Sequence, residues 1–336
     1  MGRMASLTIT LDDELLPLVQ GAHQSSIQAP LCHVPSSLKE AVVQIADVAE
    51  ANQRIKDGFY KDRLLFIIAQ PKSGSSGLGN IVSELFQAKG LPGRGYPAYM
   101  QPNQDANLRL EMVRWFLDGG VIKYHPAPIS PNLRVLKRLK CKQILTFRHP
   151  ADQLVAQACN LRGLLDESLA DEVTVYDHIY PIERKFAEDR SDGGMDRLIF
   201  ELIEGGYLLA SLNWCAQWCH LRDKTRSIVS TYEDLMMKKQ GEIARLSDFL
   251  FGETTCMAEE EFDERFETGK SSEKVSDKYP FGYTGKVGVY RDYFTQRAAE
   301  KYNEIVEAFM QTQSQGLDEY QGRYKNLLID PKTCKR

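Results

Sequence analysis

A short turn rich in glycine and serine has the composition of a phosphate cradle. It reads Pro71-Lys72-Ser73-Gly74-Ser75-Ser76-Gly77. Small residues let successive backbone N–H groups converge on an anion, and a helix that begins after such a turn adds its positive N-terminus. The hydroxyls of Ser75 and Ser76 and the ammonium group of Lys72 complete the set. A plain surface turn can have the same composition, so the turn by itself leaves both interpretations open.

The order of residues distinguishes this turn from the nucleotide loop of kinases and ATPases. In that loop, G-x-x-x-x-G-K-[ST], the lysine follows the glycines and a hydroxyl reaches Mg²⁺. Here Lys72 precedes the glycines, and no aspartate ends the apolar runs at 120–124 and 143–147 to hold a metal. The pattern indicates group transfer in which side-chain cations take the place of magnesium.

Polar residues also follow three other short apolar runs. His125 follows residues 120–124, Arg148 follows 143–147, and Tyr232 follows 227–231. An imidazole has a pKa suited to a general base near neutral pH, and a guanidinium binds phosphate in bidentate fashion. A satisfied turn histidine and half of a structural ion pair are the alternatives for His125 and Arg148.

The elements that must position these residues alternate between strands and helices. The run at 63–69 is apolar throughout, as expected for a strand buried on both faces of a parallel sheet. Helical spacing follows at 79–89, from 152 onward, and from the strand end at 232 through 251. The pattern predicts an α/β domain with a central, mostly parallel sheet flanked by helices on both faces. Ligands of such sheets bind beyond the carboxyl ends of the strands.

Five segments follow one another in the order of a known family. They are residues 68–76, 121–126, 147–152, 231–235 and 279–295. They resemble, in turn, the Y-P-K-S-G-T-T-W, K-T-H-L-P, R-N-x-x-D, Y-E-D-[LM] and P-F-x-R-K-G-x-x-G-D-W-x-x-x-F-T segments of sulfotransferases that use 3′-phosphoadenosine 5′-phosphosulfate (PAPS). The resemblance runs over roughly residues 62–310, near the family's spacing. It implies a P-loop-like strand–loop–helix unit, PAPS as cosubstrate, adenosine 3′,5′-bisphosphate (PAP) as product, and no required metal.

The resemblance implies a role for each polar residue. His125 would remove the acceptor proton, Lys72 would meet the charge on the oxygen leaving with the 5′-phosphate, and Lys123 would neutralise the sulfuryl oxygens. Arg148 would clamp the 3′-phosphate, and Tyr232 would lie beside the purine. The remaining expected donor-binding positions are Ser73, Gly74, Ser75, Ser76, Gly77, Ala156, Phe281, Gly282, Tyr283, Thr284, Gly285 and Lys286.

Three differences from the family pattern stand out, and all of them concern the adenosine 3′-phosphate or the purine. Ala156 stands where the family has a serine eight residues after the arginine, and Gly77 stands where it has a tryptophan. Tyr283-Thr284 replaces an Arg-Lys pair, with Lys286 as the remaining cation nearby. Gln157 is a candidate substitute for the missing serine. We therefore expect weaker donor binding at the 3′ end and an intact 5′ end.

Composition restricts where the protein acts. The formal net charge of −4 gives no general attraction to nucleic acid or an anionic membrane, and no apolar run is long enough to span a bilayer. The acidic N-terminus lacks the apolar core of a secretory signal, which predicts a cytoplasmic protein. Cys215 and Cys219, beside His220, lie in an apolar helical stretch, so we expect a buried helix face there rather than a metal site.

We expect three parts along the chain: an N-terminal helical extension over 1–60 with a helix at 37–56, a sulfotransferase domain over 61–312, and a C-terminal tail over 313–336. The partner would be a small molecule sulfonated on a hydroxyl or an amine. Residues 160–204 are rich in Asp and Glu, which fits either a solvated surface or a lid that favours a cationic natural product. No motif indicates an oligomeric state.

Two other functions agree with parts of the pattern. A nucleotide-dependent phosphotransferase would share the phosphate loop but needs a metal carboxylate. A non-catalytic PAP-binding relative would explain the altered 3′-phosphate contacts, whereas Lys72, Lys123 and His125 all retain transfer chemistry.

Overall fold

The computed structural model describes residues 49–93, 117–166, 184–191, 193–255, 257–268, 286–312, 316–324 and 326–335. The chain divides into two compact units, Met1–Ala46 and Asp47–Arg336, and the described residues all belong to the second. Residues 49–56 are helical, as the sequence predicts, and the rest of the expected helix at 37–56 lies outside the described residues.

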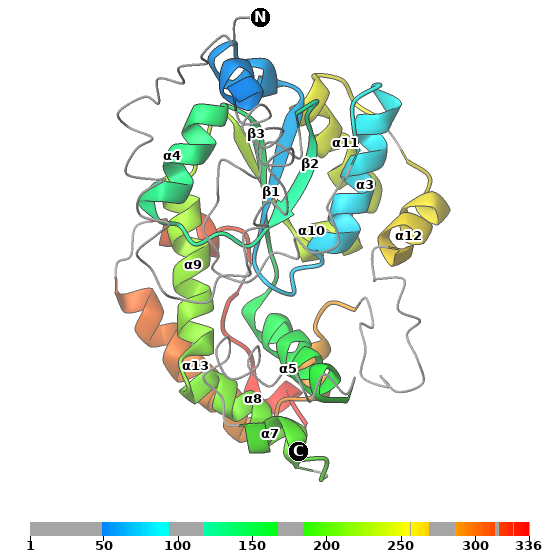
Figure 1. Ribbon diagram of the computed structural model, residues 1–336. Coiled ribbons are helices and arrows are strands. Elements are labelled where there is room, and N and C mark those ends of the chain that lie inside the picture. Colours follow the sequence, from blue (N-terminus) through cyan, green and yellow to red (C-terminus); the bar gives the residue numbers. More distant parts are fainter. Residues whose placement is uncertain are drawn as a thin grey trace, which may run out of the picture. The chain divides into compact units, whose positions relative to one another are not determined.

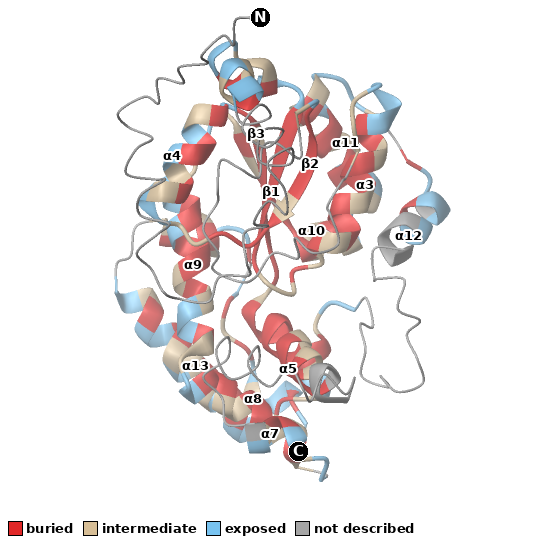
Figure 2. Cartoon of the chain, in the orientation of Figure 1, coloured by how far each residue is buried: buried red, intermediate tan, exposed pale blue. Residues whose placement is uncertain are grey.

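Four parallel strands form the central sheet (Figure 1). The strands are β1 (Leu64–Ala69), β2 (Gly120–Tyr124), β3 (Lys142–Phe147) and β4 (Ser227–Thr231), in the order β2-β1-β3-β4. Every residue of β1 is buried (Figure 2) because helices cover both faces of the sheet. The predicted α/β fold with a parallel central sheet is confirmed, and each strand lies within one residue of its expected bounds.

Alternate residues of β1 enter two separate hydrophobic cores. Leu65 and Ile67 pack with α3 (Ser75–Ala88), α10 (Tyr232–Met237), α11 (Lys239–Phe251) and α12 (Glu259–Thr268). Phe66 and Ile68 point the other way, because side chains alternate along a strand. The second core includes α4 (Ser130–Leu139), α5 (Pro150–Asp166), α7 (Arg184–Glu188), α8 (Gly194–Glu204), α9 (Tyr207–Leu221), α13 (Gln296–Gln311) and α14 (Leu317–Gln321).

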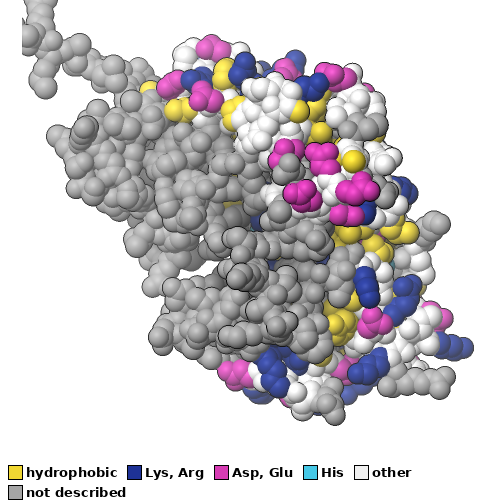
Figure 3. Space-filling view, turned by 90° about the vertical axis from the view of Figure 1, so that its right-hand side faces the viewer, with side chains coloured by type: hydrophobic (Ala, Val, Ile, Leu, Met, Phe, Trp, Pro, Cys, Tyr) yellow, Lys and Arg dark blue, Asp and Glu magenta, His cyan; other side chains and the backbone are white. Residues whose placement is uncertain are grey.

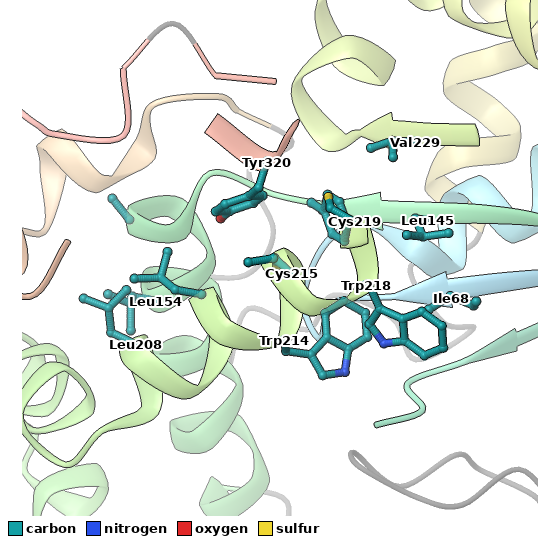
Figure 4. Close-up of a cluster of buried hydrophobic side chains, with 14 of the residues drawn as sticks. Ile68, Leu145, Leu154, Leu208, Trp214, Cys215, Trp218, Cys219, Val229 and Tyr320 are labelled. Carbon is teal, nitrogen blue, oxygen red and sulfur yellow. The ribbon is translucent and has the colours of Figure 1, made fainter. Parts of the chain in front are cut away.

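Helix α9 buries one face in the core, from Leu208 to Cys219 (Figure 4). Cys215 and Cys219 lie on this buried face, in the hydrophobic core, as the apolar sequence of the helix predicts. Trp214 packs edge-on against Phe147 at the end of β3, with ring centroids 6.1 Å apart. The ring centroid of Tyr320 from α14 lies 5.8 Å from that of Phe147, so the C-terminal residues contribute to the core behind the sheet edge.

The three-part division of the chain stays a prediction.

Two helix boundaries differ from the prediction. Helix α3 begins at Ser75, not near residue 79. Gly74 is its N-cap residue and has a left-handed φ of 75°, which glycine adopts easily. The helical stretch expected from 232 to 251 is two helices that meet at Lys238, whose φ of −132° is not helical. Three 3₁₀ turns complete the described elements: η1 (Phe59–Lys61), η4 (Val289–Asp292) and η5 (Pro331–Thr333).

Acidic and basic side chains are mixed on the molecular face that Figure 3 shows. Helix α12 carries exposed Glu260, Glu261 and Asp263, and Asp263 pairs with Lys239 of α11. Within the described parts of the chain, no helix combines the length and the apolar character needed to cross a membrane. Because acidic and basic side chains are mixed on this face, any attraction of it for an anion must be local.

Candidate functional site

The parallel register brings the predicted polar residues to one edge of the sheet. Ile68 pairs with Tyr124, so His125 follows beside Ala69. Ala69 pairs with Thr146, and Phe147 pairs with Thr231, so Arg148 and Tyr232 follow side by side. The residues after β1 thus have His125 on one side and Arg148 on the other.

The turn after β1 is closed by backbone hydrogen bonds. The Ser73 N–H donates to the Gln70 carbonyl at 3.2 Å, and the Leu78 N–H donates to the Gly74 carbonyl at 3.1 Å. Lys72 has a left-handed φ of 65°, which costs a non-glycine residue about 1 kcal/mol and needs support from its surroundings. The first-turn N–H groups of α3 have no partner within the helix. The turn therefore has the form of an anion cradle, with Ser75 and Ser76 in the first helical turn.

His125 is buried and has a defined tautomer. Its Nδ1 lies 2.7 Å from the Ala69 carbonyl, and since a carbonyl only accepts, Nδ1 carries the proton and Nε2 is left as the acceptor. Burial, followed by the positive charges of Lys123 and Lys72, lowers the pKa of His125 to about 3. The imidazole is neutral near pH 7, and the tautomer suits a base.

Two tryptophans of α9 hold the residue after His125. The indole N–H groups of Trp214 and Trp218 both donate to the Pro126 carbonyl at 3.0 Å. This contact was not predicted from the sequence, although two tryptophans four residues apart must lie on one helix face. The paired indoles fix the backbone that carries the imidazole.

Arg148 is a buried cation with few protein partners. Only 5% of the residue is exposed, and its guanidinium carbon lies 4.2 Å from the centre of the Tyr232 ring. Its Nη2 donates to the Lys286 carbonyl at 3.3 Å, whereas Nε is buried without a hydrogen-bond partner in the part of the chain that the structure describes. Among the described residues, no carboxylate forms an ion pair with it. Burying a cation in this way is costly, so the site fits an anionic ligand.

The backbone around Arg148 is tied to the same edge. Its N–H donates to Oε1 of Gln70 at 2.8 Å, and the next N–H, of His149, donates to Oε1 of Glu233 at 2.8 Å. Burial raises the pKa of Glu233 to about 7. Asp152 accepts hydrogen bonds from the N–H groups of Gly288 and Tyr290 at 2.6 and 2.9 Å, which anchors the described part of the segment 279–295 beside Arg148.

Helix α5 holds the side chain of Lys72. The Lys72 ammonium donates to Oδ1 of Asn160, which lies one helical turn after Ala156 on the same face. Asn160 was not predicted from the sequence, although its four-residue spacing from Ala156 could have suggested it. Gln157 is fully buried, and neither of its amide atoms has a hydrogen-bond partner. Its contact with the 3′-phosphate stays a prediction.

The other predicted positions divide into two groups. Lys123 is partly buried near enough to His125 to lower its pKa, and Lys286 contributes its carbonyl to Arg148. Phe281, Gly282, Tyr283, Thr284 and Gly285 lie outside the described residues, as does most of the acidic part of 160–204. In the described segments, no three His, Cys, Asp or Glu residues come together as a metal site would require.

Comparison with known proteins identifies the fold. The family model of the sulfotransferase domain matches residues 62–314. The crystal structure of mouse sulfotransferase SULT7A1 complexed with PAP is similar, with a TM-score of 0.51 and 15% identity over 82% of this chain and 94% of that chain. Retinol dehydratase in complex with androsterone and PAP has a TM-score of 0.48 and 14% identity over 80% and 86%. No curated protein sequence matches the chain significantly.

Proposed function

The chain belongs to the sulfotransferase family, and we propose that it transfers the sulfuryl group of PAPS to a hydroxyl or amine of a small molecule. The observation that supports this most is the meeting of Lys72, His125 and Arg148 around the end of β1. His125 bonds Ala69, Arg148 bonds Gln70, and Lys72 follows two residues later. A turn that carries a lysine, a neutral base and a buried guanidinium are the groups that sulfuryl transfer from PAPS requires.

The donor would bind across this edge by its two phosphates. The N-terminus of α3, with Ser75 and Ser76, would receive the 5′-phosphate, as helix N-termini do for anions. Arg148 would direct its unpartnered Nε at the 3′-phosphate, and this bond would relieve the cost of the buried cation. The Tyr232 ring, packed on the guanidinium, would form the purine side of the pocket.

His125 would act as the general base. Its Nε2 takes the proton of the acceptor hydroxyl or amine while the acceptor atom forms a bond to sulfur. The bond between sulfur and the bridging oxygen breaks, and its electron pair stays on the 5′-phosphate, where Lys72 meets the new charge. Lys123 faces the sulfuryl oxygens. The products are the sulfated acceptor and PAP, and His125 returns its proton to solvent.

The donor's negative charge would improve the base. Burial holds the pKa of His125 at about 3 in the free protein, and the charges of Lys123 and Lys72 contribute to the lowering. The phosphates would offset those charges, so the pKa of His125 rises when the donor binds. The imidazole would thus become basic where transfer takes place.

A cationic acceptor remains our hypothesis for the acceptor side. Two of the described acidic residues of 160–204 have structural partners, since Asp189 accepts from Arg197 at 2.8 Å and Asp196 from Thr295 at 2.6 Å. The hypothesis therefore depends on the other acidic residues of 160–204. Matched neutral and cationic alcohols test it: a higher kcat/KM for the cationic alcohol supports it, and equal values reject it.

Incubation with PAPS and a metabolite panel, read by mass spectrometry, tests the proposed function. We expect sulfonated product and PAP in equal amounts, without added Mg²⁺. PAP binding without any product would point to a non-catalytic relative. Phosphorylated product from ATP and Mg²⁺ would replace the proposal with a phosphotransferase.

A further inference from the structure

One face of α9 contacts the nucleotide site at several points. Tyr207, Ser211, Trp214 and Trp218 follow the spacing of a single helix face. The indoles of Trp214 and Trp218 hold Pro126 beside His125. The hydroxyl of Ser211 is linked by hydrogen bonds to Arg148, and the hydroxyl of Tyr207 is linked to the turn that carries Lys72. The hydroxyl contacts extend the proposed function beyond the residues that would touch substrate.

The first contact runs from Ser211 to Arg148 through Gln70. Gln70 is 1% exposed, and its side-chain amide has only one usable orientation. The Arg148 N–H must meet the amide oxygen, at 2.8 Å, so the amide nitrogen faces away and donates to Oγ of Ser211 at 2.9 Å. Ser211 thereby fixes the side chain that fixes the backbone of Arg148.

The second contact runs from Tyr207 to the lysine turn through Gln153. The Gln153 amide nitrogen donates to the Tyr207 hydroxyl at 2.7 Å and to the Pro71 carbonyl at 3.1 Å. Its two hydrogens suffice for these two bonds. Pro71 directly precedes Lys72, whose left-handed φ of 65° needs a fixed neighbour. Tyr207 thus supports the turn that would receive the 5′ end of the donor.

We propose that Ser211 and Tyr207 are positioning residues for opposite ends of the nucleotide. Ser211 sets the arginine for the 3′-phosphate, and Tyr207 sets the lysine turn for the 5′-phosphate. Neither residue touches the nucleotide. The inference rests on the proposed function, because it assumes that PAP occupies this edge of the sheet.

Calorimetry with two nucleotides separates the two roles. PAP carries both phosphates, whereas adenosine 5′-phosphate lacks the one assigned to Arg148. We expect Ser211→Ala to weaken PAP binding about 3- to 10-fold, the value of one hydrogen bond, and to leave adenosine 5′-phosphate binding unchanged. Tyr207→Phe should weaken both nucleotides by the same factor. Ser211→Thr, which keeps the hydroxyl, should restore PAP binding.

Gln217→Ala, an exposed change on the same helix, is the matched control and should alter neither affinity. A Ser211→Ala protein that loses affinity for both nucleotides equally, or for neither, overturns the inference while the proposed function stands. A Tyr207→Phe effect confined to PAP overturns it as well. A wild-type protein that gives no heat with PAP instead overturns the proposed function, and the inference with it.

Discussion

The two ends of the candidate nucleotide site are held in different ways. The 5′ end is fixed by protein contacts: the turn closes on itself, Gln153 holds Pro71, and Asn160 holds Lys72. At the 3′ end, Arg148 has a fixed backbone, but its buried Nε has no hydrogen-bond partner among the described residues. The backbone and the lysine of the 5′ end are therefore held by the protein itself, although the buried Ser73 hydroxyl there also lacks a described partner, whereas at the 3′ end a donor of the binding guanidinium itself is unsatisfied.

This difference has an energetic consequence. A buried cation without a carboxylate opposes folding, and a ligand that pairs with it recovers that cost on binding. A preorganised turn, in contrast, gains little stability from its ligand and serves the reaction instead. We therefore expect substitutions at the 5′ end to impair turnover in addition to nucleotide affinity, and substitutions at the 3′ end to impair mainly donor affinity.

The largest effect should come from the base beside the fixed end. His125→Ala removes the proton acceptor and should lower kcat roughly 10²- to 10⁴-fold, with an unchanged Kd for PAP. Steady-state kinetics and calorimetry on one preparation measure both. His220→Ala, at the exposed end of α9, is the control. If His125→Ala retained wild-type turnover, another group would be the base.

Arg148→Met tests the open end. It removes two charge-assisted hydrogen bonds and should weaken PAP binding about 100-fold. Since the cation is buried without a carboxylate, the Tm of the ligand-free variant should not fall below that of the wild type. Arg134→Met, on the exposed side of α4, should leave PAP affinity unchanged. A large loss of Tm together with intact PAP binding would make Arg148 a structural residue.

The carboxyl of Glu233, which accepts from the N–H of the residue after Arg148, should make the stability of the protein depend on pH. Burial raises the pKa of Glu233 to about 7, so the folded state binds more protons than the unfolded state between about pH 4.5 and 7. The free energy of unfolding should fall as pH rises through that range, because the ionised form is disfavoured in the fold. Glu233→Gln should remove this slope and add on the order of 2 kcal/mol at pH 8.

Urea unfolding at pH 5 and pH 8 measures the effect of Glu233→Gln. Glu261→Gln, exposed on α12, should keep the wild-type slope. Equal slopes for wild type and Glu233→Gln would mean that Glu233 is ionised in the fold at pH 5.

The smallest effect concerns the paired indoles. Trp214→Phe leaves Trp218 as a donor to the Pro126 carbonyl, so kcat should fall only about threefold, with PAP affinity unchanged. Adding Trp218→Phe removes the last donor, and the double variant should lose more than the product of the single effects. Purely multiplicative losses would show that the two indoles act independently of that shared carbonyl.

The sequence predicted the parts of the site that depend on local pattern. Apolar runs located the four strands, and the polar residues that follow them identified His125, Arg148 and Tyr232. The start of α3 was not predicted because Ser75 and Ser76 carry no apolar periodicity. The N-cap role of Gly74 depends on its left-handed φ, which the sequence does not show. Likewise, no Gly or Pro marks the break between α10 and α11 at Lys238.

The contacts that fix the site could not be predicted in the same way. Lys72 and Asn160 are 88 residues apart, and Trp218 and Pro126 are 92 apart. Hydrogen bonds between such distant residues depend on tertiary packing, which periodicity does not encode. The sequence indicated no role for Gln70, although its amide joins Arg148 to α9.

A crystal structure of the protein with PAP would test the central claim most directly. We predict the 5′-phosphate on the first turn of α3, beside Lys72, and the 3′-phosphate within hydrogen-bond distance of Nε of Arg148. PAP bound elsewhere, or bound here with Arg148 Nε still unpartnered, would contradict the account of an open end completed by its ligand.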